Sequence, residues 1–183
     1  MNFSETLKKI NTAINNIELD KINLIIQKIL YTSKNNRKII IAGNGGSSAT
    51  ASHVSVDLTK NAKIKCINFN EYDLITCFAN DYGYENWLSK AIEFYGEKDD
   101  LLILISCSGN SKNLVNCIAV SKKIGIDIVT FTGCEEKNNL KSKNAGLNIW
   151  VDSKDYNIIE INHHLILLSI VNELIDLKEK SKY

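Results

Sequence analysis

Residues 39–60, IIIAGNGGSSATASHVSVDLTK, decide the fold that this sequence predicts. The run at 39–42 is short, apolar and rich in isoleucine, which is typical of a buried strand in a parallel sheet. The turn at 43–48, GNGGSS, opens directly into a helix, and its glycines allow the backbone to approach a ligand closely. The exposed N–H groups at the helix start and the hydroxyls of Ser47 and Ser48 predict an anion site, most often for phosphate. The alternative is a tight strand-to-helix turn with a solvated polar face.

Two chemically active side chains follow on the same predicted helix. His53 and Asp57 are four residues apart, so they share one face of the helix. An imidazole and a carboxylate one to two turns beyond a phosphate-binding turn indicate the beginning of an active site.

Composition limits the class of protein. The chain has 183 residues, of which 44% are hydrophobic and 23% charged, with a formal net charge of +1. These values predict one domain with a full core and give no sign of a nucleic-acid or membrane partner. No apolar stretch approaches the roughly 18 residues of a membrane span, and the N-terminus is not a secretory signal. The five cysteines form no C-x-x-C pair, which predicts reduced thiols and a cytoplasmic location.

The order of elements predicts the fold class. Helical periodicity within 2–34 indicates two amphipathic helices, which we expect to pack on a sheet, to pair with another subunit, or both. Strands and helices then alternate, which predicts a three-layer α/β/α sandwich with a central parallel sheet, of the flavodoxin-like type. We expect further strands at 66–69, 101–106, 126–131 and 148–151, and helices at 71–78, 85–94, 113–124 and 158–177.

A second polar loop repeats the chemistry of the first. Residues 106–111, SCSGNS, follow a buried strand and precede a helix, and three serines there can bind one phosphate. In a parallel sheet both loops fall at the carboxyl ends of the strands, where ligands bind. The alternative is that these serines serve only as helix N-caps.

The motifs GNGGSSATASHVSVDL, ANDYG, ISCSGNS and VTFTG resemble those of the sugar isomerase (SIS) domain family, and most of all its phosphoheptose isomerases. The resemblance covers nearly the whole chain. It implies a single SIS domain over residues 1–183, with the helical pair at 1–34 used in packing or oligomerisation. It also implies a homotetramer with active sites between subunits.

The same resemblance implies roles for both loops. Cys107 stands where the family usually has threonine, and Asn44 and Asp81 match positions that line the sugar site. The residues implied to bind the substrate or its phosphate are Asn44, Gly45, Gly46, Ser47, Asp81, Ser106, Cys107, Ser108 and Ser111.

The sequence departs from the family at the catalytic and metal positions. His53 and Asp57 replace a His-x-x-x-Glu pair, and Glu160 stands at the position of a glutamine. Eight residues beyond Glu160 the family has a histidine, and here the residue is Leu168. His164 lies midway between Glu160 and Leu168 on nearly the same helix face.

His164 offers a replacement for the missing histidine. His53, Asp57, Glu160 and His164 form two i,i+4 pairs that together would supply two nitrogen and two oxygen ligands for a divalent metal such as zinc. The alternative is that these histidines are hydrogen-bonded core residues. His163 is expected to point to a neighbouring subunit or to the substrate.

The resemblance implies an aldose–ketose isomerase that acts through an enediol, and these residues supply candidates for its acid and base. Asp57 or Glu160 would be the base and His164, or His163, the acid, while a divalent ion would polarise the substrate oxygens. By resemblance the reaction converts sedoheptulose 7-phosphate to D-glycero-D-manno-heptose 7-phosphate for lipopolysaccharide or capsule precursors. The alternatives are an enzyme acting on a different phosphosugar, and a non-catalytic SIS protein like the DnaA-initiator-associating protein.

Overall fold

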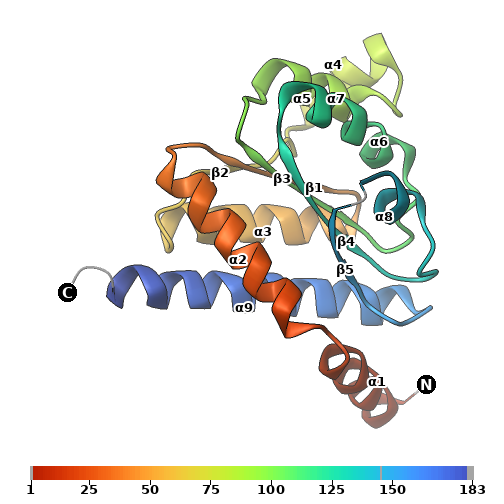
Figure 1. Cartoon of the computed structure of the whole chain (residues 1–183). Coiled ribbons are helices and arrows are strands. Elements are labelled where there is room, and N and C mark those ends of the chain that lie inside the picture. The colour runs from red at the N-terminus through yellow and green to blue at the C-terminus, as the bar shows by residue number, and fades with distance from the viewer. Residues whose placement is uncertain (1, 145, 181–183) are drawn as a thin grey trace.

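The computed structural model describes residues 2–144 and 146–180, and its centre is a parallel sheet (Figure 1). Within these residues the sheet has five strands in the order β2-β1-β3-β4-β5, and every neighbouring pair is parallel. The strands are β1 (Ile39–Gly43), β2 (Cys66–Ile67), β3 (Leu101–Ser106), β4 (Asp127–Thr132) and β5 (Leu147–Trp150).

Helices cover both faces of the sheet (Figure 1). One layer consists of α1 (Phe3–Asn15), α2 (Leu19–Lys34), α3 (Gly46–Lys60) and the long α9 (Tyr156–Lys180). The other consists of α4 (Tyr72–Tyr82), α5 (Trp87–Tyr95), α6 (Lys112–Val115), α7 (Cys117–Ile124) and α8 (Asn139–Asn144).

Successive side chains of a buried strand point to opposite faces of the sheet, so each strand contributes to two cores. In β1, Ile39 and Ile41 pack toward α2, α3 and α9, whereas Ile40 and Ala42 pack toward α5 and α7. All five residues of β1 and all six of β3 are buried, as expected for strands covered on both faces. The predicted three-layer α/β/α sandwich with a parallel sheet is confirmed.

The structure differs from the prediction in the lengths and breaks of some elements. β2 ends at Ile67, because the side chain of Asn68 accepts a hydrogen bond from the N–H of Asn70 and starts a turn. The helix predicted at 113–124 is divided at Asn116, whose side-chain amide donates to the carbonyl of Glu85 and the side chain of Asn86. Helix α8 was not predicted.

The two N-terminal helices behave differently. α2 buries Ile25, Ile26 and Ile29 against the sheet, which confirms that this helix packs on the core. In α1 the one buried residue is Ala13, and Phe3 at the start of the helix is 78% exposed. The apolar stripe of α1 is therefore largely uncovered in a single chain.

Helix α9 is longer and more apolar than we expected of any segment. Among the described residues, α9 is the one helix whose length and composition would allow it to cross a membrane. Half of that apolar window is buried inside the molecule, and nine of its residues, from Ile158 to Leu174, belong to the buried set. We therefore describe α9 as a core helix that packs on α1, α2 and α3.

Candidate active site

The two glycine- and serine-containing loops lie side by side at the carboxyl edge of the sheet. β1 and β3 are hydrogen-bonded neighbours, with Gly43 opposite Ile105, and each strand runs directly into its loop. The chain leaves β1 toward one edge of the sheet and β3 toward the other. The loops therefore flank the topological switch point, where open α/β sheets bind ligands.

A small cavity opens between these loops and the beginning of α9. Its volume is 130 Å³. Six of the nine residues predicted to bind substrate line it, namely Asn44, Ser47, Ser106, Cys107, Ser108 and Ser111. The cavity is also lined by Ile105, Leu114, Tyr156 and Glu160.

Local turn chemistry sets the shape of the second loop. Ser106 Oγ accepts a hydrogen bond from the N–H of Gly109 at 3.2 Å, and Ser108 Oγ accepts one from the N–H of Asn110 at 3.2 Å. Gly109 has φ 65°, a conformation that favours glycine. Ser111 precedes α6, but its side chain makes no capping hydrogen bond. The Ser111 hydroxyl therefore does not serve as an N-cap.

The first loop brings the start of α3 against the carboxylate of Glu160. Gly45 has φ 53°, so the loop needs a glycine there. A Cβ atom at Gly46 would overlap the Glu160 carboxylate. Neither glycine lines the cavity, yet the absence of a side chain at Gly46 lets Glu160 lie at the amino end of α3. The helix dipole favours negative charge at this position.

Asn44 is held by a partner that the sequence did not reveal. Its Nδ2 donates to Asn113 Oδ1 at 3.0 Å, and Asn113 Nδ2 donates to Asn44 Oδ1 at 2.8 Å. Asn113 is 2% exposed and belongs to α6, immediately after the serine loop. This reciprocal amide pair ties the two loops together and fixes which atoms Asn44 presents to the cavity.

The thiol of Cys107 is a neutral group at the wall of the cavity. Burial, followed by the negative charge of Glu160, raises the pKa of Cys107 to about 12. Its Sγ lies 3.9 Å from Glu160 Oε1 and is placed to donate a weak hydrogen bond. Cys107 is therefore not a thiolate nucleophile in this site.

His53 lies between His164 and Asp57. His53 Nδ1 is 3.0 Å from His164 Nε2, and His53 Nε2 is 3.3 Å from Asp57 Oδ2. Partial burial, followed by the neighbouring His53, lowers the pKa of His164. The structure thus brings together residues of α3 and α9 that are more than 100 positions apart, as the two predicted pairs require.

The four predicted metal ligands do not converge on one point. The two ring nitrogens of His53 face different partners, and Glu160 faces Gly46 and Cys107 instead. Throughout residues 2–144 and 146–180, no group of three His, Cys, Asp or Glu residues is placed to hold a metal ion. The present side-chain arrangement therefore does not fit zinc, and the metal site stays a prediction.

His163 contradicts its predicted role. Its side chain is fully buried, its Nε2 is 3.1 Å from the carbonyl oxygen of Thr132, and its ring packs edge-on against Phe131. Burial lowers the pKa of His163 to about 4, so the ring is neutral near pH 7. His163 is therefore a hydrogen-bonded core residue, and its ring is open neither to the cavity nor to the surface.

Of the residues predicted for catalysis or metal binding, Glu160 lines the cavity, whereas His53, Asp57 and His164 do not. The predicted sugar-site residue Asp81 and the position of the missing family histidine, Leu168, also lie outside it. Asp81 is an exposed residue of α4 whose carboxylate accepts a hydrogen bond from Asn80 at 2.9 Å. Leu168 is half-buried against the core formed with α9 and supplies no polar group. Tyr156, conversely, was missed, although it precedes Glu160 by four residues and therefore shares its helix face.

Comparisons with known proteins identify the family of this chain. The family model described as SIS domain matches residues 2–133. Over 158 residues the chain is 32% identical to a phosphoheptose isomerase of Campylobacter concisus, which covers 83% of this chain and 82% of that protein. A phosphoheptose isomerase of Cytophaga hutchinsonii is 36% identical over 149 residues, or 76% and 78% of the two chains.

A solved structure shows the same fold. Phosphoheptose isomerase GmhA from Neisseria gonorrhoeae superposes with a TM-score of 0.86 and 23% identity, over 94% of each chain. Together with the sequence relatives and the serine-lined cavity at the switch point, this places the chain in the SIS domain family, among the phosphoheptose isomerases.

Proposed function

We propose that this protein is an aldose–ketose isomerase that converts sedoheptulose 7-phosphate to D-glycero-D-manno-heptose 7-phosphate. The observation that carries the proposal is the cavity itself, in which a carboxylate and the hydroxyls of two adjacent serine-containing loops face one space in a chain of the phosphoheptose isomerase family.

The serine loops would bind the phosphate group. The hydroxyls of Ser47, Ser106, Ser108 and Ser111 line the cavity and can each donate a hydrogen bond to a phosphate oxygen. The cavity contains no lysine or arginine among its described lining residues. Phosphate recognition would therefore rest on hydroxyl groups and on the amino end of α3.

Glu160 would act as the base. Its carboxylate lies in the cavity, so it can remove a proton from C1 of the ketose and return it to C2 of the enediol. Because the pKa of Cys107 is raised, its side chain is a neutral thiol and adds no second negative charge beside this carboxylate. Asn44, with its amide fixed by Asn113, would donate a hydrogen bond to a sugar oxygen.

The acid role is assigned to His164. It lies one turn beyond Glu160 on the same side of α9 and contacts His53, which in turn contacts Asp57. This row of groups can pass a proton between the active-site face of α9 and Asp57. Asp57 would thus act through the histidines and not as the base.

A zinc ion would require a change in this row. His53 must turn one ring nitrogen away from its present partner before three donors can meet, so no step of the scheme passes through a metal. Turnover in the presence of a chelator, with and without added zinc, tests this part of the proposal separately.

We also propose the homotetramer with active sites between subunits. Val56 on α3 and Ile161 and Leu165 on α9 are 57%, 44% and 45% exposed, and they belong to the same two helices as His53 and His164. A second subunit on this face would bury these apolar side chains and close the open side of the histidine row. Light scattering of the purified protein measures its oligomeric state, and we expect the mass of a tetramer.

The same proposal includes a cytoplasmic location and a place in the synthesis of heptose-containing precursors. The cysteines Cys66, Cys77, Cys107, Cys117 and Cys134 are all free thiols, which suits a cytoplasmic enzyme. A heptose phosphate product would supply lipopolysaccharide or capsule precursors.

Nuclear magnetic resonance of the sugar protons tests the reaction. Purified protein in deuterated water should convert sedoheptulose 7-phosphate to the aldose and exchange the C2 proton with solvent. A second candidate is a phosphosugar-binding protein without turnover, which Leu168 favours because the family histidine is missing there. Line broadening of the sugar signals without conversion or exchange would support that candidate and refute the isomerase.

A further inference from the structure

Tyr84 lies beside the active-site cavity, in the turn between α4 and α5. Its Oη is 3.5 Å from Oδ1 of Asn44, and Asn44 lines the cavity. Tyr84 is 57% exposed and is a member of neither of the two cores that the described residues form. An aromatic side chain that stands on a loop at the edge of a site, without packing in the core, is well placed to contact a ligand.

The cavity is too small for a whole phosphosugar. Its volume is 130 Å³, whereas pockets that enclose small ligands span about 300–1,000 Å³. A heptulose phosphate would therefore place part of its length in the cavity and extend past the lining residues. Where it extends past Asn44, it would meet the hydroxyl of Tyr84.

The hydroxyl of Tyr84 is available to such a ligand. O–H···O hydrogen bonds span about 2.5–3.0 Å, so the 3.5 Å contact with Asn44 is a long one. Asn44 Oδ1 already accepts a bond of 2.8 Å from Nδ2 of Asn113. Tyr84 Oη can therefore donate to a sugar oxygen, or accept from a sugar hydroxyl, without losing a strong bond.

The turn that carries Tyr84 is fixed by its main chain. Gly83 has φ 83° and ends α4, and its N–H donates to the carbonyl of Ala79 at 3.0 Å. The N–H groups of Asn86 and Trp87 donate in turn to the carbonyl of Gly83, at 3.0 and 3.1 Å. The side chain of Tyr84 therefore leaves a closed turn, which holds it beside the cavity.

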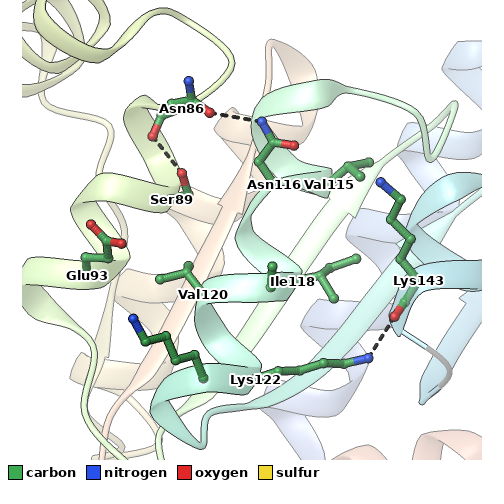
Figure 2. Close-up of a pocket in the computed structure, with 11 residues that line it drawn as sticks. Asn86, Ser89, Glu93, Val115, Asn116, Ile118, Val120, Lys122 and Lys143 are labelled. Carbon is green, nitrogen blue, oxygen red and sulfur yellow. Dashed lines mark hydrogen bonds between the residues drawn. The ribbon is translucent and has the colours of Figure 1, made fainter.

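Asn116, at the junction of α6 and α7, fastens this turn to the active-site layer. Its Nδ2 donates to the carbonyl of Glu85 at 2.9 Å. It also donates to Asn86 Oδ1 at 3.1 Å, and Figure 2 shows this bond between the two side chains. Helix α6, which ends at Asn116, contains Asn113 of the amide pair. One short helix thus holds both the amide pair and the turn.

We propose that Tyr84 is a specificity-determining residue that binds a hydroxyl group of the sugar chain between the reacting carbons and the phosphate. The proposal rests on the proposed function, because it places a phosphosugar in the cavity. A seven-carbon ketose phosphate gains this hydrogen bond, whereas a five-carbon one, with a shorter chain, does not reach it. A site built to bind a substrate hydroxyl discriminates in this way against a substrate that lacks it. Asn116 is a positioning residue that acts through Tyr84.

Equilibrium dialysis tests the contact, because it counts bound sugar phosphate whether or not the protein converts it. The ligands are sedoheptulose 7-phosphate, ribulose 5-phosphate and inorganic phosphate, each with the full chain as wild type and as Tyr84→Phe. We expect the variant to bind the heptulose phosphate about threefold to tenfold more weakly, and the other two ligands with a change of less than about twofold. The control Tyr72→Phe removes the hydroxyl of a tyrosine that is 81% exposed at the start of α4, and it should change none of the three.

The outcomes separate Tyr84 from the isomerase. A loss of equal size for all three ligands, or no loss for the heptulose phosphate, would overturn the role of Tyr84 and leave the isomerase standing. Selective binding that depends on Tyr84 in a protein without turnover would refute the isomerase and support Tyr84. A protein that binds neither sugar phosphate would overturn both.

A second variant tests the positioning role of Asn116. Asn116→Leu keeps a similar shape and removes both donated bonds, so we expect the same selective loss for the heptulose phosphate, with no further loss in combination with Tyr84→Phe. The control Lys122→Ala removes the bond of 2.8 Å from Lys122 Nζ to the carbonyl of Lys143 (Figure 2) and should leave the discrimination between the sugars unchanged. Additive losses in the double variant would refute an action through Tyr84.

Discussion

The half of the cavity that we propose as the phosphate-binding half and the histidine row beyond it are built in different ways. The serine loops are shaped by main-chain geometry, with Gly45 and Gly109 at positive φ and backbone N–H groups bound by Ser106 and Ser108. The row of His53, Asp57 and His164 depends on side-chain rotamers of half-exposed residues on two helices. Main-chain sites are rigid in a single chain, whereas such a row can be rearranged by a partner subunit, a substrate or a metal.

The largest effect on activity is expected at Glu160, where the two halves meet. Glu160→Gln keeps the shape of the side chain and removes the base, so kcat should fall by about 10²–10⁴-fold while the phosphosugar still binds. Turnover measured by proton exchange checks this. Glu173→Gln, an exposed position on the same helix, is the control and should retain full activity. Unchanged turnover in Glu160→Gln would move the base to Asp57.

A smaller loss of activity is expected when Glu160 is present but its carboxylate is moved. In Gly46→Ala the new Cβ overlaps the carboxylate of Glu160, which must move away from the amino end of α3. We expect kcat to fall by roughly tenfold or more, because small misplacements of a catalytic group are costly. Glu160→Asp, one methylene shorter, should reduce the penalty of Gly46→Ala in the double variant. Simple additivity of the two losses would show that Gly46 acts through the backbone and not through Glu160.

The amide pair tests the rigidity of the phosphate-binding half. Asn113→Ala removes both hydrogen bonds of the amide pair and leaves Asn44 only the long one from the Tyr84 hydroxyl, so we expect KM to rise about threefold to tenfold with a smaller change in kcat. If Asn113 is a positioning residue that acts through Asn44, its effect should vanish in an Asn44→Ala background. This double-mutant cycle should show a coupling of about 0.5–3 kcal/mol. Independent effects in the cycle, with equal melting temperatures, would argue against the pair.

The smallest effect on turnover is expected at His163, which lies in neither half. Its pKa is about 4 in the folded protein and near 6.5 when unfolded, so between these values the unfolded state binds more protons. The free energy of unfolding should therefore decrease as pH falls from 6.5 toward 4, by up to about 1.4 kcal/mol per pH unit from this group.

His163→Gln isolates that contribution. Glutamine can still donate to the carbonyl of Thr132 but does not titrate, so urea unfolding at several pH values should give a flatter profile than wild type. Turnover at pH 7 should be close to wild type in this variant. A profile identical to that of wild type would show that His163 does not titrate with unfolding.

Periodicity and turn chemistry predicted most of the fold. Continuous apolar runs, glycine before a helix and serine after a strand are local patterns, and they located β1, β3 and both loops, which border the cavity. The boundaries of β2 and α6 could not be predicted in this way, because the side chains of Asn68 and Asn116 end these elements through hydrogen bonds to distant or non-periodic partners.

The sequence by itself determined which residue types stand at the carboxyl edge of the sheet, because each loop is tied to its own strand. Spacing alone also predicted that His53 and Asp57, and Glu160 and His164, would share helix faces. Only the tertiary structure decided that His163 belongs to the core and His164 to the surface, since a rotation of about 100° per residue separates these neighbours on α9. The tertiary structure also decided that Asn113 is hydrogen-bonded to Asn44 and that Glu160 faces the start of α3. Such contacts depend on how elements distant in the sequence pack together.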